Sequence, residues 1–180
     1  MPKIVDRQQY QQKLATQAAQ LFLKHGYSQL GMRQLALELG LSKSALYHYF
    51  PSKESLFSAS LEAITQQGMQ LSQLCLTAPL TERVDALLSL MQQIEQRFAN
   101  EIGLVLDYIR GMNSQQVRAD QHMQLAEKKY LELIAQYVGE QSAKKTYHIL
   151  MGVMLGRLMD GQTTTWDEAK IWLLSALNTP

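Results

Sequence analysis

Basic, hydroxyl and aromatic side chains are concentrated behind a short turn, Gly40-Leu41-Ser42. The segment after this turn would leave six side chains on its outer surface: Lys43, Ser44, Ala45, Tyr47, His48 and Tyr49. Lysine ammonium groups and tyrosine hydroxyls commonly bind nucleic-acid phosphates, and a solvated helix face rarely carries two large aromatic side chains without a partner. These residue types therefore predict contact with DNA. The sequence contains no nucleophile elbow, phosphate loop or metal-binding motif, so it does not predict an enzyme.

Two short helices are expected on either side of this turn. One should run over residues 32–39, and a second, capped by Ser42, should end before Pro51. Gly40 can adopt the positive φ that a tight turn needs, and Ala36 is small enough for the helices to approach closely. The residues expected to face inward are Leu35, Leu41, Leu46 and Phe50. This arrangement has the length of a helix-turn-helix.

The charge is unevenly distributed, although the net charge of the chain is only +1. Residues 1–60 hold seven Lys or Arg against three Asp or Glu, whereas the remainder holds ten against thirteen. A basic head on a mildly acidic body predicts that only the head meets a polyanion. A chance fluctuation in small counts is the alternative.

Nearly all of the chain is expected to be helical, because apolar residues recur at intervals of three and four. Further helices are predicted at residues 6–25, 52–74, from Val84 to Phe98 after the break at Pro79, 102–110, 115–138, 141–160 and 166–177. Thr165 and Glu168 should form a capping box at the start of the last helix. The prediction is an all-α fold of about nine helices.

The motif Gly26-Tyr27, then Leu35-Ala36, then residues 40–56 resembles the DNA-binding domain of the TetR family of bacterial transcriptional regulators. A helical hairpin with coincidental tyrosines is the alternative. The resemblance implies a three-helix, helix-turn-helix DNA-binding domain over residues 1–56. It also implies a helical effector-binding and dimerisation domain over residues 57–180.

The resemblance assigns roles to individual residues. Ser42 would cap the recognition helix, and Lys43, Ser44 and Ala45 on its first turn would point at base edges. Lys43 is the best candidate for reading guanine, because serine hydroxyls are permissive and alanine offers only a methyl group. The expected phosphate contacts are Tyr47, His48, Tyr49 and Lys53, the last assisted by the positive end of its helix.

One departure from the family pattern lies before the second helix. The family usually has hydroxyl residues there, whereas this chain has Leu30 and Gly31, so that helix should be only weakly capped. Arg33 could replace the missing phosphate contact by charge, or it could simply be exposed to solvent.

A recognition helix alone reads only a few base pairs, so a two-fold symmetric homodimer on double-stranded operator DNA is expected. The last two helices carry more apolar surface than one core requires. The resemblance to the TetR family implies that the protein dimerises through these helices. The predicted interface comprises Gly152, Val153, Gly156, Trp166, Leu173 and Leu177. Packing within one subunit only is the alternative.

A pocket for an unknown, hydrophobic small-molecule effector is expected mainly from the family resemblance. Adaptable methionines and aromatic residues on the middle helices would line it: Met91, Phe98, Tyr108, Met112, Met123, Tyr130 and Tyr137. The same pattern also fits ordinary core packing.

Several classes of site and location are not expected. Cys75 is the only cysteine, which excludes an internal disulfide and fits a cytoplasmic protein, and no cofactor is predicted. His122 and His148 have no carboxylate or cysteine at metal-ligand spacing, so no metal site is predicted. The apolar residues 149–159 are too few to cross a bilayer, so a buried helix is expected there. Residues 1–10 lack the apolar core of a signal peptide, so export is not expected.

The leading interpretation is a ligand-responsive repressor. A family member without an effector, using DNA as a platform for protein partners, is the second. A helical enzyme or lipid carrier with a degenerate DNA-binding domain is the third, opposed by the presence of Lys43, Tyr47 and Lys53.

Overall fold

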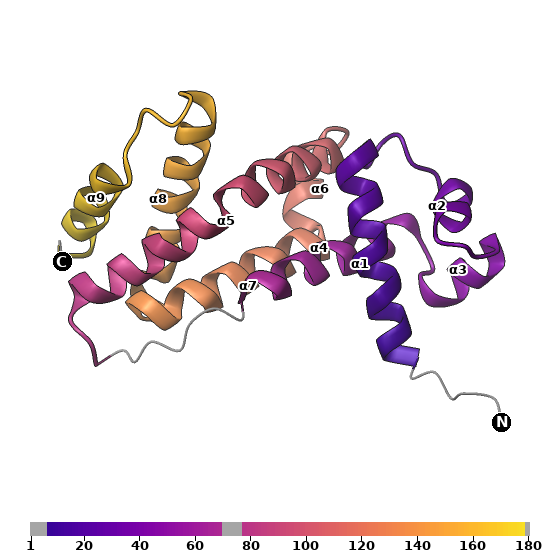
Figure 1. Ribbon diagram of the computed structural model, residues 1–180, viewed down its shortest axis with the longest axis horizontal. Helices are drawn as coiled ribbons and strands as arrows, with labels where there is room; N and C mark the ends of the chain where they lie inside the picture. The colour runs from indigo at the N-terminus through magenta and orange to yellow at the C-terminus, as the bar shows by residue number, and fades with distance from the viewer. Residues whose placement is uncertain (1–6, 70–76, 179–180) are drawn as a thin grey trace. The chain divides into compact units, whose positions relative to one another are not determined.

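The computed structural model describes residues 7–69 and 77–178, and all regular structure within them is helical. The helices are α1 (Arg7–His25), α2 (Met32–Glu38), α3 (Lys43–Tyr49), α4 (Lys53–Met69), α5 (Leu80–Ile109), α6 (Ser114–Ala119), α7 (Gln121–Val138), α8 (Glu140–Met159) and α9 (Trp166–Asn178) (Figure 1). The predicted all-α fold is confirmed. None of these helices combines the length and apolar composition that a membrane span needs.

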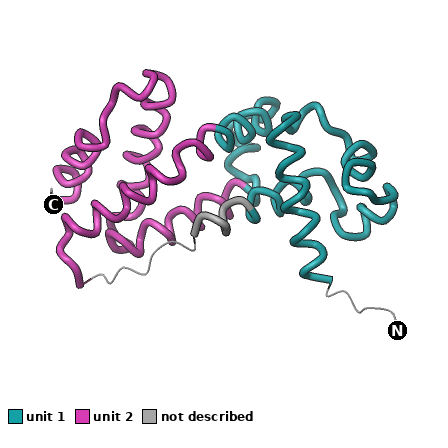
Figure 2. Tube along the Cα trace, viewed as in Figure 1, with its two compact units in different colours: residues 1–70, 100–122 teal, residues 71–99, 123–180 magenta. Residues whose placement is uncertain are grey.

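The described residues fall into two compact units (Figure 2). One contains residues 7–69 and 100–122, and the other contains residues 77–99 and 123–178. Helix α5 contributes to both units, because its last ten residues belong with the helix-turn-helix. The segment that carries the predicted DNA-reading residues therefore packs with residues 100–122 as one body.

The first unit is built around α1, which packs along α4, while α2 packs on α3. Leu14, Phe22 and Phe57 are buried in this core. Helix α1 ends where Gly26 adopts a φ of +81°, a conformation that glycine tolerates and that commonly ends helices. The predicted stop at Gly26 is confirmed, whereas Cys75 and the predicted end of the fourth helix at Leu74 lie outside the described residues.

Helix α5 runs without a break from Leu80 to Ile109, so the prediction of two separate helices in this segment is wrong. The sequence had suggested that the stripe ending at Phe98 and a helix over residues 102–110 were separate. Leu104 and Tyr108 continue the buried stripe beyond Phe98, and their burial outweighs the penalty of about 1 kcal/mol for an exposed glycine at position 103.

The predicted single helix over residues 115–138 is also wrong, because the chain breaks at Asp120 between α6 and α7. The backbone of Asp120 is extended, and its carboxylate accepts hydrogen bonds from the amide of His122 (3.0 Å) and the hydroxyl of Tyr108 (2.7 Å). Asp120 thus caps the start of α7 instead of continuing α6.

The second unit is tied together by Arg157 on α8, which is only 6% exposed. Its guanidinium donates to both carboxylate oxygens of Glu95 on α5, at 2.7 and 3.2 Å, and to the carbonyl of Thr164. The same group lies 4.7 Å from the ring centroid of Trp166 on α9. One buried cation therefore connects α5, α8 and the start of α9.

The predicted capping box of the last helix is confirmed. The amide of Glu168 donates to the hydroxyl of Thr165 at 3.2 Å, and the Glu168 carboxylate accepts from the Thr165 amide at 2.7 Å. These reciprocal bonds fix the first turn of α9.

Replacing Glu95 by leucine should lower the free energy of unfolding by about 3 kcal/mol, because Arg157 would be left buried without its anion. Urea denaturation measures the change. The matched control is Lys128→Met, which breaks the exposed pair of Lys128 and Glu132 (3.8 Å) and should lower stability by less than about 1 kcal/mol. Equal losses in the two variants would contradict the role of the Arg157 cluster.

Candidate nucleic-acid interface

The turn between α2 and α3 is fixed by backbone hydrogen bonds. Gly40 has a φ of +70°, and the amide of Leu41 donates across the turn to the carbonyl of Ala36 at 2.8 Å. This bond closes the end of α2 as in a Schellman motif. Ala36 is buried at the place where the two helices approach, as its small size predicted.

The inward face of the helix-turn-helix is formed largely as predicted. Leu35, Leu46 and Phe50 are buried, whereas Leu41 is half-buried. Because these residues anchor both helices in the core of the first unit, the opposite face of α3 is held toward solvent.

Ser42 caps α3, which confirms the prediction. Its hydroxyl oxygen accepts a hydrogen bond from the amide of Ala45 at 3.1 Å and lies 3.0 Å from the hydroxyl of Ser44. The Ser44 hydroxyl is therefore held at the first turn of α3, where a base edge could be read.

The outer face of α3 gathers four of the six side chains named from the sequence. Lys43, Ser44 and His48 are exposed, and Tyr47 is 40% exposed with the Lys43 ammonium 5.7 Å from its ring centroid. Ala45 is half-buried. This face offers a cation, two hydroxyls and an imidazole to a partner.

Tyr49 lies differently from its neighbours, because its ring is half-buried against the first helix. Its ring centroid is 5.3 Å from that of Tyr10 on α1 and 5.5 Å from that of His48. Tyr49 thus joins the end of α3 to α1.

Arg7 and Gln11 of α1 hold the C-terminal end of α3. Arg7 donates to the carbonyl of His48 at 3.3 Å, and Gln11 donates to the carbonyl of Tyr49 at 3.2 Å. Carbonyls at the C-terminal end of a helix lack partners within the helix, so these two donors satisfy them. The positive charge of Arg7 is also attracted to the negative end of the helix dipole. Sequence reasoning missed both residues, since no local pattern signals a contact across about 40 positions.

Lys53 begins α4 and is half-buried, with its ammonium nitrogen 3.9 Å from the ring centroid of Tyr27. Burial lowers the pKa of Lys53, whereas Glu54 and Asp107 raise it. Reciprocal bonds of 3.1 Å between Ser52 and Ser55 fix the start of this helix. The first turn of α4 therefore places a cation beside the helix-turn-helix.

The expected weakness at the start of α2 is confirmed, because Gly31 is the N-cap and provides no side-chain hydrogen bond. Leu30 is buried, so the leucine at this position fills the core of the first unit. Arg33 is exposed on the first turn of α2.

The residues predicted to line an effector pocket are divided between the two units. Met91, Tyr108 and Tyr137 are buried, while Phe98, Met112, Met123 and Tyr130 are half-buried. In the first unit the Tyr108 ring stacks on Phe57 at 4.7 Å. The pocket that these residues were expected to form stays a prediction.

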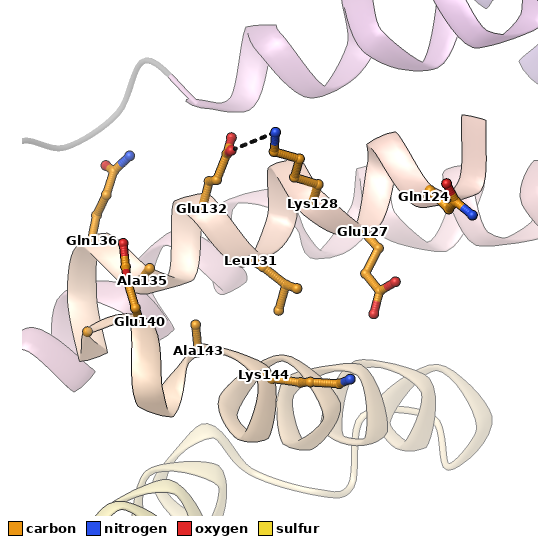
Figure 3. Close-up of a pocket in the computed structure, with 11 residues that line it drawn as sticks. Gln124, Glu127, Lys128, Leu131, Glu132, Ala135, Gln136, Glu140, Ala143 and Lys144 are labelled. Atoms are coloured by element: carbon orange, nitrogen blue, oxygen red, sulfur yellow. Dashed lines mark ion pairs between the residues drawn. The ribbon is translucent and has the colours of Figure 1, made fainter. Parts of the chain in front are cut away.

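A groove of about 730 Å³ lies in the second unit, along α7 and α8 (Figure 3). Leu131, Ala135 and Ala143 are its apolar lining, and the ion pair of Lys128 and Glu132 lies at its α7 side. The residues predicted for the effector pocket do not line this groove.

The predicted dimer residues occupy different environments on α8 and α9. Val153 and Leu173 are buried within the subunit, Gly156, Trp166 and Leu177 are half-buried, and Gly152 is exposed. The large apolar side chains exposed on these helices are Leu158, Met159, Ile171 and Trp172. A hollow of about 360 Å³ lies beside Trp172, lined in part by Gly152 and Gly156. We call these exposed residues, with Gly152 and Gly156, the α8–α9 face.

Comparison with known proteins supports the identification of the helix-turn-helix. Residues 14–60 match the family model described as bacterial regulatory proteins of the tetR family. The nucleoid occlusion factor SlmA of Haemophilus ducreyi is 38% identical over 66 residues, which are 37% of this chain and 33% of that protein. The match thus spans about a third of this curated relative.

Solved structures resemble this chain over nearly its whole length. The multidrug binding protein EbrR, crystallised with imidazole, has a TM-score of 0.74 at 17% identity and is matched over 100% of this chain and 95% of its own. NalD of Pseudomonas aeruginosa, the secondary repressor of the MexAB-OprM efflux pump, has a TM-score of 0.53 at 19% identity, with 96% of both chains covered. At these identities the likeness shows the fold.

Replacing Gly31 by serine should raise the free energy of unfolding by about 0.3 kcal/mol, because a hydroxyl would then cap α2. A Cβ at this position meets nothing within 4 Å, and φ is −95°, so the substitution brings no strain. Gly31→Ala is the matched control and should be about 1 kcal/mol less stable than the serine variant. Urea denaturation measures both, and equal stabilities would contradict the assignment of position 31 as the N-cap.

Proposed function

We propose that this chain, whose residues 14–60 match the family model of bacterial regulatory proteins of the tetR family, is a repressor that binds a palindromic operator as a homodimer. In this proposal residues 1–56 read double-stranded DNA, and residues 57–180 bind an effector and dimerise. The observation that carries it is the exposed face of α3, where Lys43, Ser44, Tyr47 and His48 lie together.

The roles within this face follow from the geometry of DNA. The N-terminal residues of a recognition helix meet base edges in the major groove, while phosphates lie on either side of it. Lys43 and Ser44 would accordingly read bases, with Ala45 offering a methyl group from its half-buried position. Tyr47, His48, Lys53 and Arg33 would bind phosphates, and Tyr49 would chiefly support α3.

The proposed homodimer is supported by the α8–α9 face. Ile171 is 65% exposed and Trp172 is 48% exposed, although both are large apolar residues on a well-formed helix. Large apolar residues exposed to solvent commonly mark a protein interface. Gly152 and Gly156, which line a hollow together with Trp172, would let a second helix approach closely.

We further propose that a small, hydrophobic effector releases the repressor from DNA. The resemblance in fold to EbrR, described as a multidrug binding protein, and to NalD, described as a secondary repressor, supports this proposal. The predicted pocket residues on the middle helices, such as Met91 and Tyr130, remain the candidates for effector contacts. An effector must bind the two forms of the repressor unequally, by about 1 to 3 kcal/mol, to release it.

An effector-independent DNA-binding protein that serves as a platform for protein partners is the second candidate. The match to SlmA, described as a nucleoid occlusion factor, favours it, and the groove along α7 and α8 offers a partner an apolar floor. A genome-wide binding map separates the two functions. A repressor should occupy a few promoters, whereas a platform protein should occupy many dispersed chromosomal sites.

Lys43→Ala should relax the preference for one base position of the operator and weaken operator binding by about 1 to 3 kcal/mol. Tyr47→Phe should instead weaken binding to specific and random duplexes alike, because the lost hydroxyl contacts a phosphate. Fluorescence anisotropy on both kinds of duplex measures these effects. Equal losses on operator and random DNA for Lys43→Ala would refute its assignment to base reading.

Trp172→Glu should convert the protein to a monomer and strongly reduce operator affinity, because a charge would be buried in the proposed interface. Sedimentation velocity measures the oligomeric state. The matched control is Leu125→Glu on α7, since Leu125 is 41% exposed, close to the 48% of Trp172. The control should stay dimeric, and a dimeric Trp172→Glu variant would argue against this interface.

A further inference from the structure

Tyr27 contacts charged and aromatic groups on several sides. The Lys53 ammonium nitrogen lies 3.9 Å from its ring centroid, and its hydroxyl donates to a carboxylate oxygen of Glu54 at 3.1 Å. The rings of Phe57 and Tyr108 lie 4.8 and 4.9 Å away, in tilted and edge-to-face arrangements. Tyr27 therefore has little freedom to turn.

The surroundings of Tyr27 are held by two carboxylates. Asp107 at the end of α5 accepts hydrogen bonds from the amide and the hydroxyl of Ser28, at 2.7 and 3.0 Å. Asp120 accepts from the hydroxyl of Tyr108 at 2.7 Å. The turn that carries Tyr27 is thus fastened to the end of α5 within the first unit.

The Tyr27 ring is a suitable support for the Lys53 ammonium. A cation is attracted to the negative face of an aromatic ring, and a hydroxyl that donates to a carboxylate makes that face more negative. An ammonium has three donors, so contact with the ring leaves others available to an oxygen. A long side chain fixed before binding also loses less conformational entropy when its partner arrives.

We propose that Tyr27 is a positioning residue for Lys53, holding its ammonium at the start of α4 in the orientation that binds a DNA phosphate. This inference rests on the proposed DNA-binding function. The hydrogen bond that Tyr27 donates also fixes the carboxylate of Glu54 beside the same ring. Tyr27 itself does not touch the DNA in this arrangement.

A double-mutant cycle in the full chain tests the inference, with a fluorescent random-sequence duplex as the probe. Tyr27→Leu should lower duplex affinity about fivefold, the size of an exposed cation–π contact. It should also reduce the salt dependence of binding by about one phosphate contact. In a Lys53→Met background, Tyr27→Leu should have no further effect. Tyr27→Phe should restore most of the affinity, since it keeps the ring.

The matched control is Tyr147→Leu, which removes another half-buried tyrosine from α8 and should leave duplex affinity unchanged. Circular dichroism confirms that each variant is folded at the temperature of the titration. A purely structural role for Tyr27 would weaken binding equally with Lys53 or Met at position 53, and this result would overturn the inference. Tighter duplex binding by Tyr27→Leu would overturn the inference too, because it would mean that the Tyr27 ring keeps the Lys53 ammonium from binding a phosphate.

A second measurement needs no DNA. In protein with isotope-labelled lysine, the ε-methylene protons of Lys53 should resonate upfield in the NMR spectrum, because they lie over the ring. Tyr27→Leu should abolish this shift and Tyr27→Phe should keep it. Absence of the shift in the unsubstituted protein would overturn the inference alone, whereas failure of that protein to bind any duplex would overturn the proposed function and the inference with it.

Discussion

The seven-residue helix α3 is too short to persist in water by itself, because helices of this length do not offset the unfavourable first turn. Its existence depends on burial of Leu46 and Phe50 in the core of the first unit. The Ser42 cap and the bonds from Arg7 and Gln11 then satisfy both of its ends. The position of the exposed side chains of α3 therefore depends on the core beneath them. Damage to α1 would displace this proposed DNA-binding surface without removing any of its side chains.

Features with local causes could be predicted from the sequence. The glycine stops, the Ser42 cap and the reciprocal bonds of Thr165 and Glu168 each depend on residues within four positions of one another. The continuity of α5 and the break at Asp120 could not be predicted in this way. Each depends on Tyr108, which extends a buried stripe and binds the carboxylate of Asp120.

The candidate site shows the same division. Sequence and family resemblance identified the residues of α3, because they follow one another along the chain. The supporting contacts of Arg7, Gln11 and Tyr27 come from segments 26 to 41 positions distant, which no periodicity links to α3 or α4. On α8 and α9 the apolar residues were recognised, but their orientation was not. Val153 and Leu173 point into the subunit, whereas Ile171 and Trp172 are exposed.

Both tryptophans of the chain lie on α9, although their surroundings differ. The indole of Trp166 is covered by the guanidinium of Arg157, while that of Trp172 is about half open to water. Light at the long-wavelength edge of protein absorption excites tryptophan and not tyrosine. The fluorescence that it produces therefore originates at α9 alone. The unlabelled protein thus carries its own optical reporter for changes in the surroundings of α8 and α9. This reporter is separate from the emission of the tyrosines in the first unit.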